Sequence, residues 1–148
     1  ALFMAMGCIF MRLGSVEIHN MHGLARQMPW TMAAFVAGGL SLIGVPLTAG
    51  FISKWYLVNA ALTDSYWPLA VLILVSSLLA LNYIWRVVEA AYFHVPGADM
   101  HKVREAPASL LIPTWLLIGV NLYVGIDAGL ITAIAQQGAA SLIGQALL

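Results

Sequence analysis

Long apolar runs separated by short polar segments make up most of the chain. The runs that could form membrane helices cover residues 1–13, 29–62, 66–93 and 108–126. A transmembrane helix needs about 20 consecutive apolar residues, so the first run is expected to be the second half of a span. The last two runs are long enough for one span each. This pattern predicts an all-α integral membrane protein, built as a transmembrane helix bundle.

The run of residues 29–62 is longer than one span needs, and short for two spans joined by a turn. It contains Pro46, which has no backbone N–H to donate to the Leu42 carbonyl and therefore interrupts a helix. Irregular backbone at membrane depth persists only where protein or a water-filled cavity covers it. We therefore expect one discontinuous helix, with halves over residues 29–44 and 48–62.

The residues around this break are suited to a hinge. Glycine weakens a helix locally, and a hydroxyl side chain can bond to backbone groups that a break leaves free. The predicted hinge residues are Gly44, Pro46, Thr48 and Gly50.

Charge asymmetry predicts the orientation in the membrane. Residues 14–27 and 94–106 form polar loops, and the basic residues at these loops are Arg12, Arg26, Lys102 and Arg104. The other side carries only Asp64 and Asp127. Because Lys and Arg accumulate in cytoplasmic loops, both polar loops are predicted to be cytoplasmic. Both polar loops fall on the same side of the membrane only if residues 29–62 cross it once.

The tail, residues 128–148, has no charge and is rich in Ala, Gly and Gln. Gln136 and Gln137 would lie at its centre if it crossed the membrane. An interfacial helix is favoured, and a further span is the alternative. Residues 1–127 are expected to form the C-terminal part of a larger transmembrane domain, because the chain begins abruptly within apolar sequence.

Composition also indicates an integral membrane protein. Hydrophobic residues make up 62% of the chain and charged residues 8%, whereas soluble domains have about 25% charged residues. The net charge is zero, so no basic surplus indicates nucleic acid as a partner. The sequence contains no phosphate-binding Gly loop and no nucleophile triad that would indicate an enzyme. No cofactor is expected. His19 and His22 are three residues apart, too weak a pattern for a metal site.

Lys54 is the residue most indicative of function. It lies within the second half of the broken helix, about 12 Å from its end. An ionisable residue at membrane depth is costly and often belongs to an ion pathway. Lys54 is therefore the predicted proton-translocation residue. The alternative is a side chain that extends to the membrane surface without a transport role.

Arg86 and Glu89 are a second candidate pair. They are three residues apart on one predicted helix, a spacing at which side chains can interact. An anchoring pair at the cytoplasmic end is the favoured interpretation. A role in proton uptake from the cytoplasm is the alternative.

The segment GLARQMPWTMAAFVAGGLSLIGVPLTAGFISKWYL, residues 23–57, resembles the discontinuous helix of the antiporter-like proton-translocating subunits. These are membrane subunits of respiratory complex I and of Mrp-type multisubunit cation/proton antiporters. SSLLALNYIWRVVEAAYF, residues 76–93, followed by a polar loop and REAP, looks closest to the D-type branch of the Mrp subunits. The resemblance extends to about Asp127.

This resemblance implies a transport subunit, and not an enzyme, in a bacterial inner membrane. Lys54 matches the family residue assigned to the proton path, while Gly44 and Pro46 match the helix break. The implied partners are other membrane subunits, lipid, and the transported H⁺ with Na⁺ in an Mrp setting. In a complex I setting, the host would be a proton-translocating NADH-quinone oxidoreductase.

Two hypotheses follow. In the first, the chain belongs to a subunit that moves protons, with Lys54 alternating between charged and neutral forms. In the second, it is a structural module needed for assembly, and Lys54 pairs with a fixed carboxylate on a neighbour. A third and weaker hypothesis is a subunit that binds quinone or haem. It is weaker because no His pair lies on facing spans.

Overall fold

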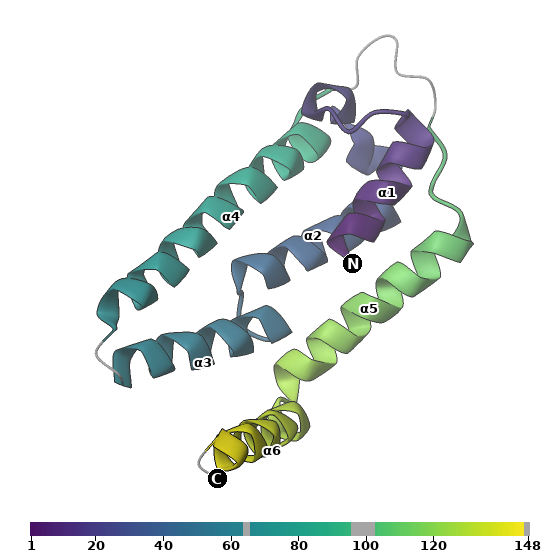
Figure 1. The fold of residues 1–148 in the computed structure, drawn as a ribbon. Helices are drawn as coiled ribbons and strands as arrows, with labels where there is room; N and C mark the ends of the chain where they lie inside the picture. The colour runs from purple at the N-terminus through teal and green to yellow at the C-terminus, as the bar shows by residue number, and fades with distance from the viewer. Residues whose placement is uncertain (64–65, 96–102, 147–148) are drawn as a thin grey trace.

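The computed structural model describes residues 1–63, 66–95 and 103–146, and these residues are helical with short connections (Figure 1). The prediction of an all-α transmembrane bundle is confirmed. Residues 64–65, 96–102 and 147–148 lie outside the described residues, and with them Asp64 and Lys102 of the orientation prediction and the last two residues of the tail. The α-helices are α1 (Leu2–Leu13), α2 (Pro29–Ile43), α3 (Ala49–Thr63), α4 (Trp67–Phe93), α5 (Ala108–Ile126) and α6 (Gly129–Ala146). Two 3₁₀ turns, η1 (Ile18–Met21) and η2 (Leu24–Arg26), connect α1 to α2.

The half-helices α2 and α3 run in the same direction, and α4 runs back beside both of them (Figure 1). Together α2 and α3 therefore form one discontinuous helix, as the sequence predicted. The first half ends at Ile43 and the second begins at Ala49, so the break is slightly longer than expected. Within the described residues, α4 and α5 are the two single helices long and apolar enough to span a membrane.

The most densely buried region lies where α1, the 3₁₀ turns and the start of α2 meet α4 and α5. Its largest fully buried apolar side chains are Ile9, Met21, Leu24, Met28 and Met32. Gly39 of α2 allows a close approach here, since a Cβ at this position would lie 2.8 Å from Cγ2 of Ile84 on α4. Small residues commonly permit such approaches between membrane helices. This packing fixes α2 against α4.

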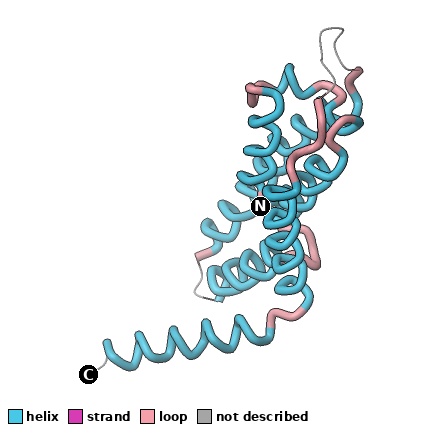
Figure 2. Tube along the Cα trace, turned by 90° about the vertical axis from the view of Figure 1, so that its right-hand side faces the viewer, coloured by secondary structure: helices cyan, strands magenta, loops and turns pink. Residues whose placement is uncertain are grey.

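Helix α6 leaves the end of α5 and projects sideways from the bundle (Figure 2). It is not among the described helices that qualify as membrane spans. Its Ala128 connection and Thr132 face a cavity shared with α3 and α5. These observations leave the interfacial interpretation of the tail as a prediction.

Candidate functional site

The break begins with a glycine that ends α2. Gly44 has φ +91°, and its N–H and that of Val45 both donate to the carbonyl of Leu40 at 3.0 Å. This is the left-handed termination that glycine favours, because other residues are strained there. The chain then turns instead of continuing the helix, and the carbonyls of the last turn need other donors.

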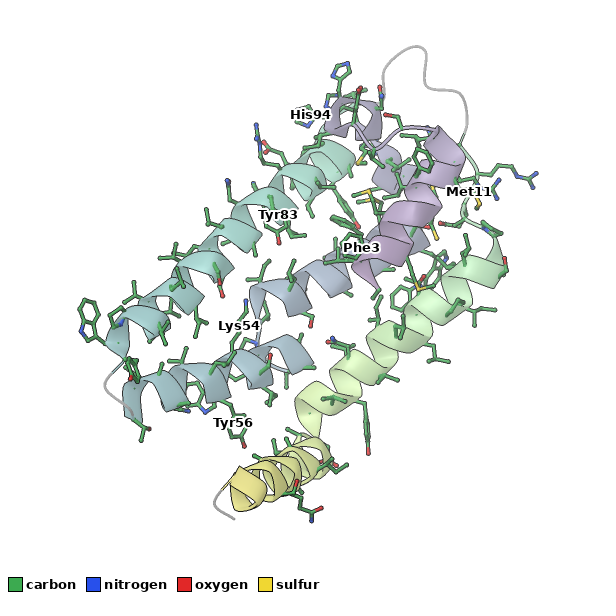
Figure 3. The ribbon with its side chains drawn as sticks, in the orientation of Figure 1. Phe3, Met11, Lys54, Tyr56, Tyr83 and His94 are labelled. Carbon is green, nitrogen blue, oxygen red and sulfur yellow. The ribbon has the colours of Figure 1, made fainter. Side chains whose placement is uncertain are left out.

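Lys54 supplies those donors from the second turn of α3. Its Nζ donates to the carbonyl oxygens of Leu42 at 2.7 Å and Ile43 at 2.9 Å. It also donates to Oγ of Ser77, on α4, at 2.7 Å. Figure 3 shows Lys54 between α3 and the carboxyl end of α2. The ammonium thus takes the place of the N–H that Pro46 lacks, and it lies at the negative end of the α2 dipole.

The predicted hinge residues all lie at this interruption. The hydroxyl of Thr48 donates to the Val45 carbonyl at 2.7 Å, as expected of a side chain beside freed backbone groups. Gly50 lies against the last turn of α2, where a Cβ would overlap the Ser41 carbonyl oxygen. At Gly125, on α5, a Cβ would overlap the Leu47 carbonyl. Helix α5 therefore covers the irregular backbone that membrane depth would otherwise leave exposed.

A cavity of about 920 Å³ opens beside Lys54. Its lining comes from the start of α1 and from α2, α3, α5 and α6, and is mainly small and apolar. The polar side chains that line it with Lys54 are Ser41, Ser53, Tyr56, Asn121 and Thr132. Lys54 is only partly buried, so the ammonium has both fixed hydrogen-bond acceptors and a route to the surface.

Arg86 and Glu89 do not join this site. Both side chains are exposed on α4 beyond Ile84, toward the loop end of the bundle. In the part of the chain that the structure describes, the two side chains form no ion pair with each other. Their predicted roles remain predictions.

The histidines of the first loop are more organised than the sequence indicated. The ring of His22 stacks on that of His94 with centroids 4.6 Å apart, and His19 meets His22 edge-on at 4.9 Å. The N–H of Gly23 donates to the Ala90 carbonyl at 3.1 Å, which fastens the loop to α4. Within the described residues, no group of three His, Cys, Asp or Glu side chains is placed to hold a metal ion.

Ser77 is the site residue that sequence reasoning missed. It is 23 positions from Lys54, and a serine in an apolar helix commonly bonds to its own backbone. Its hydroxyl also lies 3.2 Å from the Ile73 carbonyl. The neighbouring Ser76 bonds only within its helix, to the same carbonyl. No signal in the sequence distinguishes these two serines.

Residues 1–80 match the transmembrane family described as NADH:quinone oxidoreductase/Mrp antiporter. The chain belongs to this family. The N subunit of the NADH-quinone oxidoreductase from Desulforudis audaxviator is 39% identical over 136 residues, covering 83% of this chain and 27% of that protein. The D subunit of the Na⁺/H⁺ antiporter from Bacillus subtilis is 26% identical over 143 residues, covering 97% of this chain and 29% of that protein.

Two solved structures are similar to this chain in fold. A chain of the Mrp complex from a Dietzia species aligns with a TM-score of 0.87 and 25% identity, over 95% of this chain and 34% of that one. A chain of the archaeal membrane-bound sulfane sulfur reductase, a respiratory membrane complex, aligns with a TM-score of 0.79 and 32% identity. That match covers 87% of this chain and 21% of the other.

The predicted superfamily is therefore confirmed, and relatives from both of its branches are found. The chain spans about a third or less of the length of the relatives and structures described above. The two solved structures are multisubunit membrane complexes.

Proposed function

We propose that this chain is part of an antiporter-like subunit that moves protons across the membrane, with Lys54 as a protonation site on the path. The observation that carries the proposal is the set of three hydrogen bonds made by the Lys54 ammonium. All three acceptors, on Leu42, Ile43 and Ser77, are neutral oxygens. A lysine held in this way is stabilised as a cation without being fixed by a carboxylate.

The hydrogen bonds can accommodate a change of protonation. An ammonium has three N–H donors, and the three oxygens use all of them. A neutral amine has two donors and one lone pair. The Ser77 hydroxyl can donate to that lone pair, whereas the two carbonyls can only accept. Ser77 therefore provides the acceptor for the charged form and the donor for the neutral form.

The break and the cavity complete this account. The carbonyl end of α2 contributes about half a negative charge, which offsets part of the cost of a cation at membrane depth. The cavity beside Lys54 provides a route for proton exchange toward the side of α3 and α6. Residues 14–27 connect α1 to α2 at the opposite end of the bundle, which is the cytoplasmic side of a bacterial inner membrane in the predicted orientation.

The host complex is either an Mrp-type antiporter or a complex I-like NADH-quinone oxidoreductase. The subunit carries ions and does not catalyse the redox chemistry in either setting. Its partners are the other membrane subunits, lipid, H⁺ and, in an Mrp setting, Na⁺. Arg86 and Glu89 remain candidates for the cytoplasmic side of the path.

The alternative function is a structural module without an ion path, in which Lys54 pairs with a carboxylate on a neighbour. The present hydrogen bonds favour transport, because all three ammonium donors already have acceptors. A carboxylate would have to displace one of them.

Ion movement by the full-length subunit in its native complex tests this proposal. Inverted vesicles carrying wild type, Lys54→Ala and Lys54→Glu are compared, and native gels report assembly. The expected result is that Lys54→Ala assembles without ion movement, while Lys54→Glu restores part of it. Normal ion movement by Lys54→Ala would refute the protonation role, and failed assembly would favour the structural module.

A further inference from the structure

A carboxylate from a distant loop lies at the other end of α2. Oε2 of Glu105 accepts a hydrogen bond from the N–H of Trp30 at 3.1 Å. Oε1 accepts from both the N–H and the hydroxyl of Thr31, at 3.3 and 2.5 Å. Both backbone donors belong to the first turn of α2, which begins at Pro29. Glu105 therefore caps a helix that lies more than 70 residues earlier in the chain.

The start of α2 requires such a cap from elsewhere. Met28 is the N-cap residue, and its side chain makes no capping hydrogen bond. The first N–H groups of a helix have no partner within the helix, and leaving them unbonded in a buried site is costly. Thr31 is fully buried, so the Glu105 carboxylate meets this need where water has little access.

A second contact holds the two loops together. The side-chain Oε1 of Gln27 accepts a hydrogen bond from the N–H of Val103 at 2.7 Å. The ring of Trp30 also meets Trp115 of α5 edge-on, with centroids 6.1 Å apart. Glu105 is therefore fixed to the amino end of α2 by its surroundings as well as by its own hydrogen bonds.

The half-helix α2 consequently has opposite charges at its two ends. The Glu105 carboxylate lies at the positive end of the helix dipole, and the Lys54 ammonium lies at the negative end. Thr31 and Ile43 are 12 residues apart, or about 18 Å along a helix. The helix therefore holds the carboxylate and the ammonium at a fixed separation, and the two opposite charges attract each other over that distance.

We propose that Glu105 is a positioning residue for Lys54, acting through α2 to set the carbonyls that hold the ammonium and to stabilise its charged form. This inference rests on the proposed role of Lys54 as a protonation site. Other charged or titratable groups lie near the two residues. Arg104 adjoins Glu105 in the chain and is exposed, and Cys8 of α1 lies within electrostatic range of Glu105. Near Lys54, Tyr56 lines the same cavity.

The pH profile of ion movement in inverted vesicles tests this role in the full-length subunit within its complex. Glu105→Gln removes the charge but retains an acceptor oxygen. Because loss of a negative charge about 18 Å away disfavours the ammonium, the profile is expected to move to lower pH by about half a unit. An assembly role alone would reduce the amount of complex without moving the profile.

Two further variants sharpen the comparison. Combining Glu105→Gln with Thr31→Asp places a carboxylate on the first turn of α2 itself, where acidic side chains are favoured, and is expected to restore the profile. Glu17→Gln is the matched control, because this exposed glutamate bonds to Asn20 of its own loop. Its profile should coincide with wild type.

A wild-type profile for assembled Glu105→Gln, with Lys54→Ala inactive, would overturn this inference and leave the proposed function intact. Normal ion movement by Lys54→Ala would overturn the proposed function itself. If Glu105→Gln does not assemble, the double variant decides, and failure of both variants to assemble would assign Glu105 to assembly and overturn the inference. A wild-type profile from the double variant supports the inference, and a displaced profile contradicts it.

Discussion

Nζ of Lys54 lies 2.7 Å from the carbonyl oxygen of Leu42, the backbone acceptor that Pro46 leaves without an N–H donor. The proline and the lysine are therefore parts of one arrangement. Pro46 frees a carbonyl inside the membrane domain, and Lys54 bonds to it from the next half-helix. A break with no such donor would leave a polar group unsatisfied at membrane depth, at a cost of several kcal/mol.

Ser77→Ala should slow ion movement without preventing assembly. The change removes one of the three ammonium acceptors, and a hydrogen bond to a charged group contributes about 1.5–3 kcal/mol. We expect the initial rate in vesicles to fall by about tenfold.

Ser76→Ala is the matched control for Ser77→Ala. Ser76 is exposed and bonds to the Ile73 carbonyl of its own helix at 2.7 Å. Its replacement should leave the rate near wild type. Equal rates for the two variants would remove Ser77 from the site.

Gly50→Ala should prevent the half-helices from packing. The added Cβ would overlap the Ser41 carbonyl oxygen, and neither backbone can yield cheaply. Overpacking typically costs about 1–3 kcal/mol, and a backbone clash of this kind should reach the upper end of that range. The amount of assembled subunit on a native gel should fall severalfold.

Gly119→Ala on α5 provides the comparison, because a Cβ there meets nothing within 4 Å. This variant should assemble normally. Normal assembly by Gly50→Ala would show that the contact between α2 and α3 differs from the one described.

Docking of the first loop onto α4 should depend on pH through His22. Desolvation lowers the pKa of His22 below its usual value of 6.5, and the neighbouring His94 and His19 lower it further. The docked state thus binds fewer protons than the released state between the lowered pKa and 6.5. The stability that His22 contributes is full above 6.5 and is lost as the pH falls through that window.

Hydrogen exchange at the Gly23 amide measures this docking, since that N–H bonds to the Ala90 carbonyl. Exchange should accelerate as the pH falls below 6.5, after correction for intrinsic rates, and His22→Asn should remove the pH dependence. An identical dependence in the variant would assign it to other groups.

The broken helix was predictable because its signals are local. Pro46 and its neighbouring glycines interrupt an apolar run, and each limits the backbone within a turn of its own position. Lys54 was equally visible, as a single cation within apolar sequence. These features require no knowledge of which helices are neighbours.

The partners of that helix were not predictable in the same way. Ser77 and Glu105 reach α2 and α3 through contacts between segments far apart in the chain. Two serines in an apolar helix cannot be distinguished until the rotation of the helix about its axis is known. Glu105 lies in a polar loop, where a carboxylate is common. The stacking of His22 on His94 depends on the same long-range packing.

Ion movement by Lys54→Arg in the assembled complex tests the central claim most directly. Arginine keeps a long cationic side chain at the break, but its guanidinium remains protonated at any physiological pH. If Lys54 alternates between charged and neutral forms, the variant should assemble and lose nearly all ion movement in inverted vesicles. Wild-type ion movement by assembled Lys54→Arg would show that a fixed charge is sufficient, and would contradict the account.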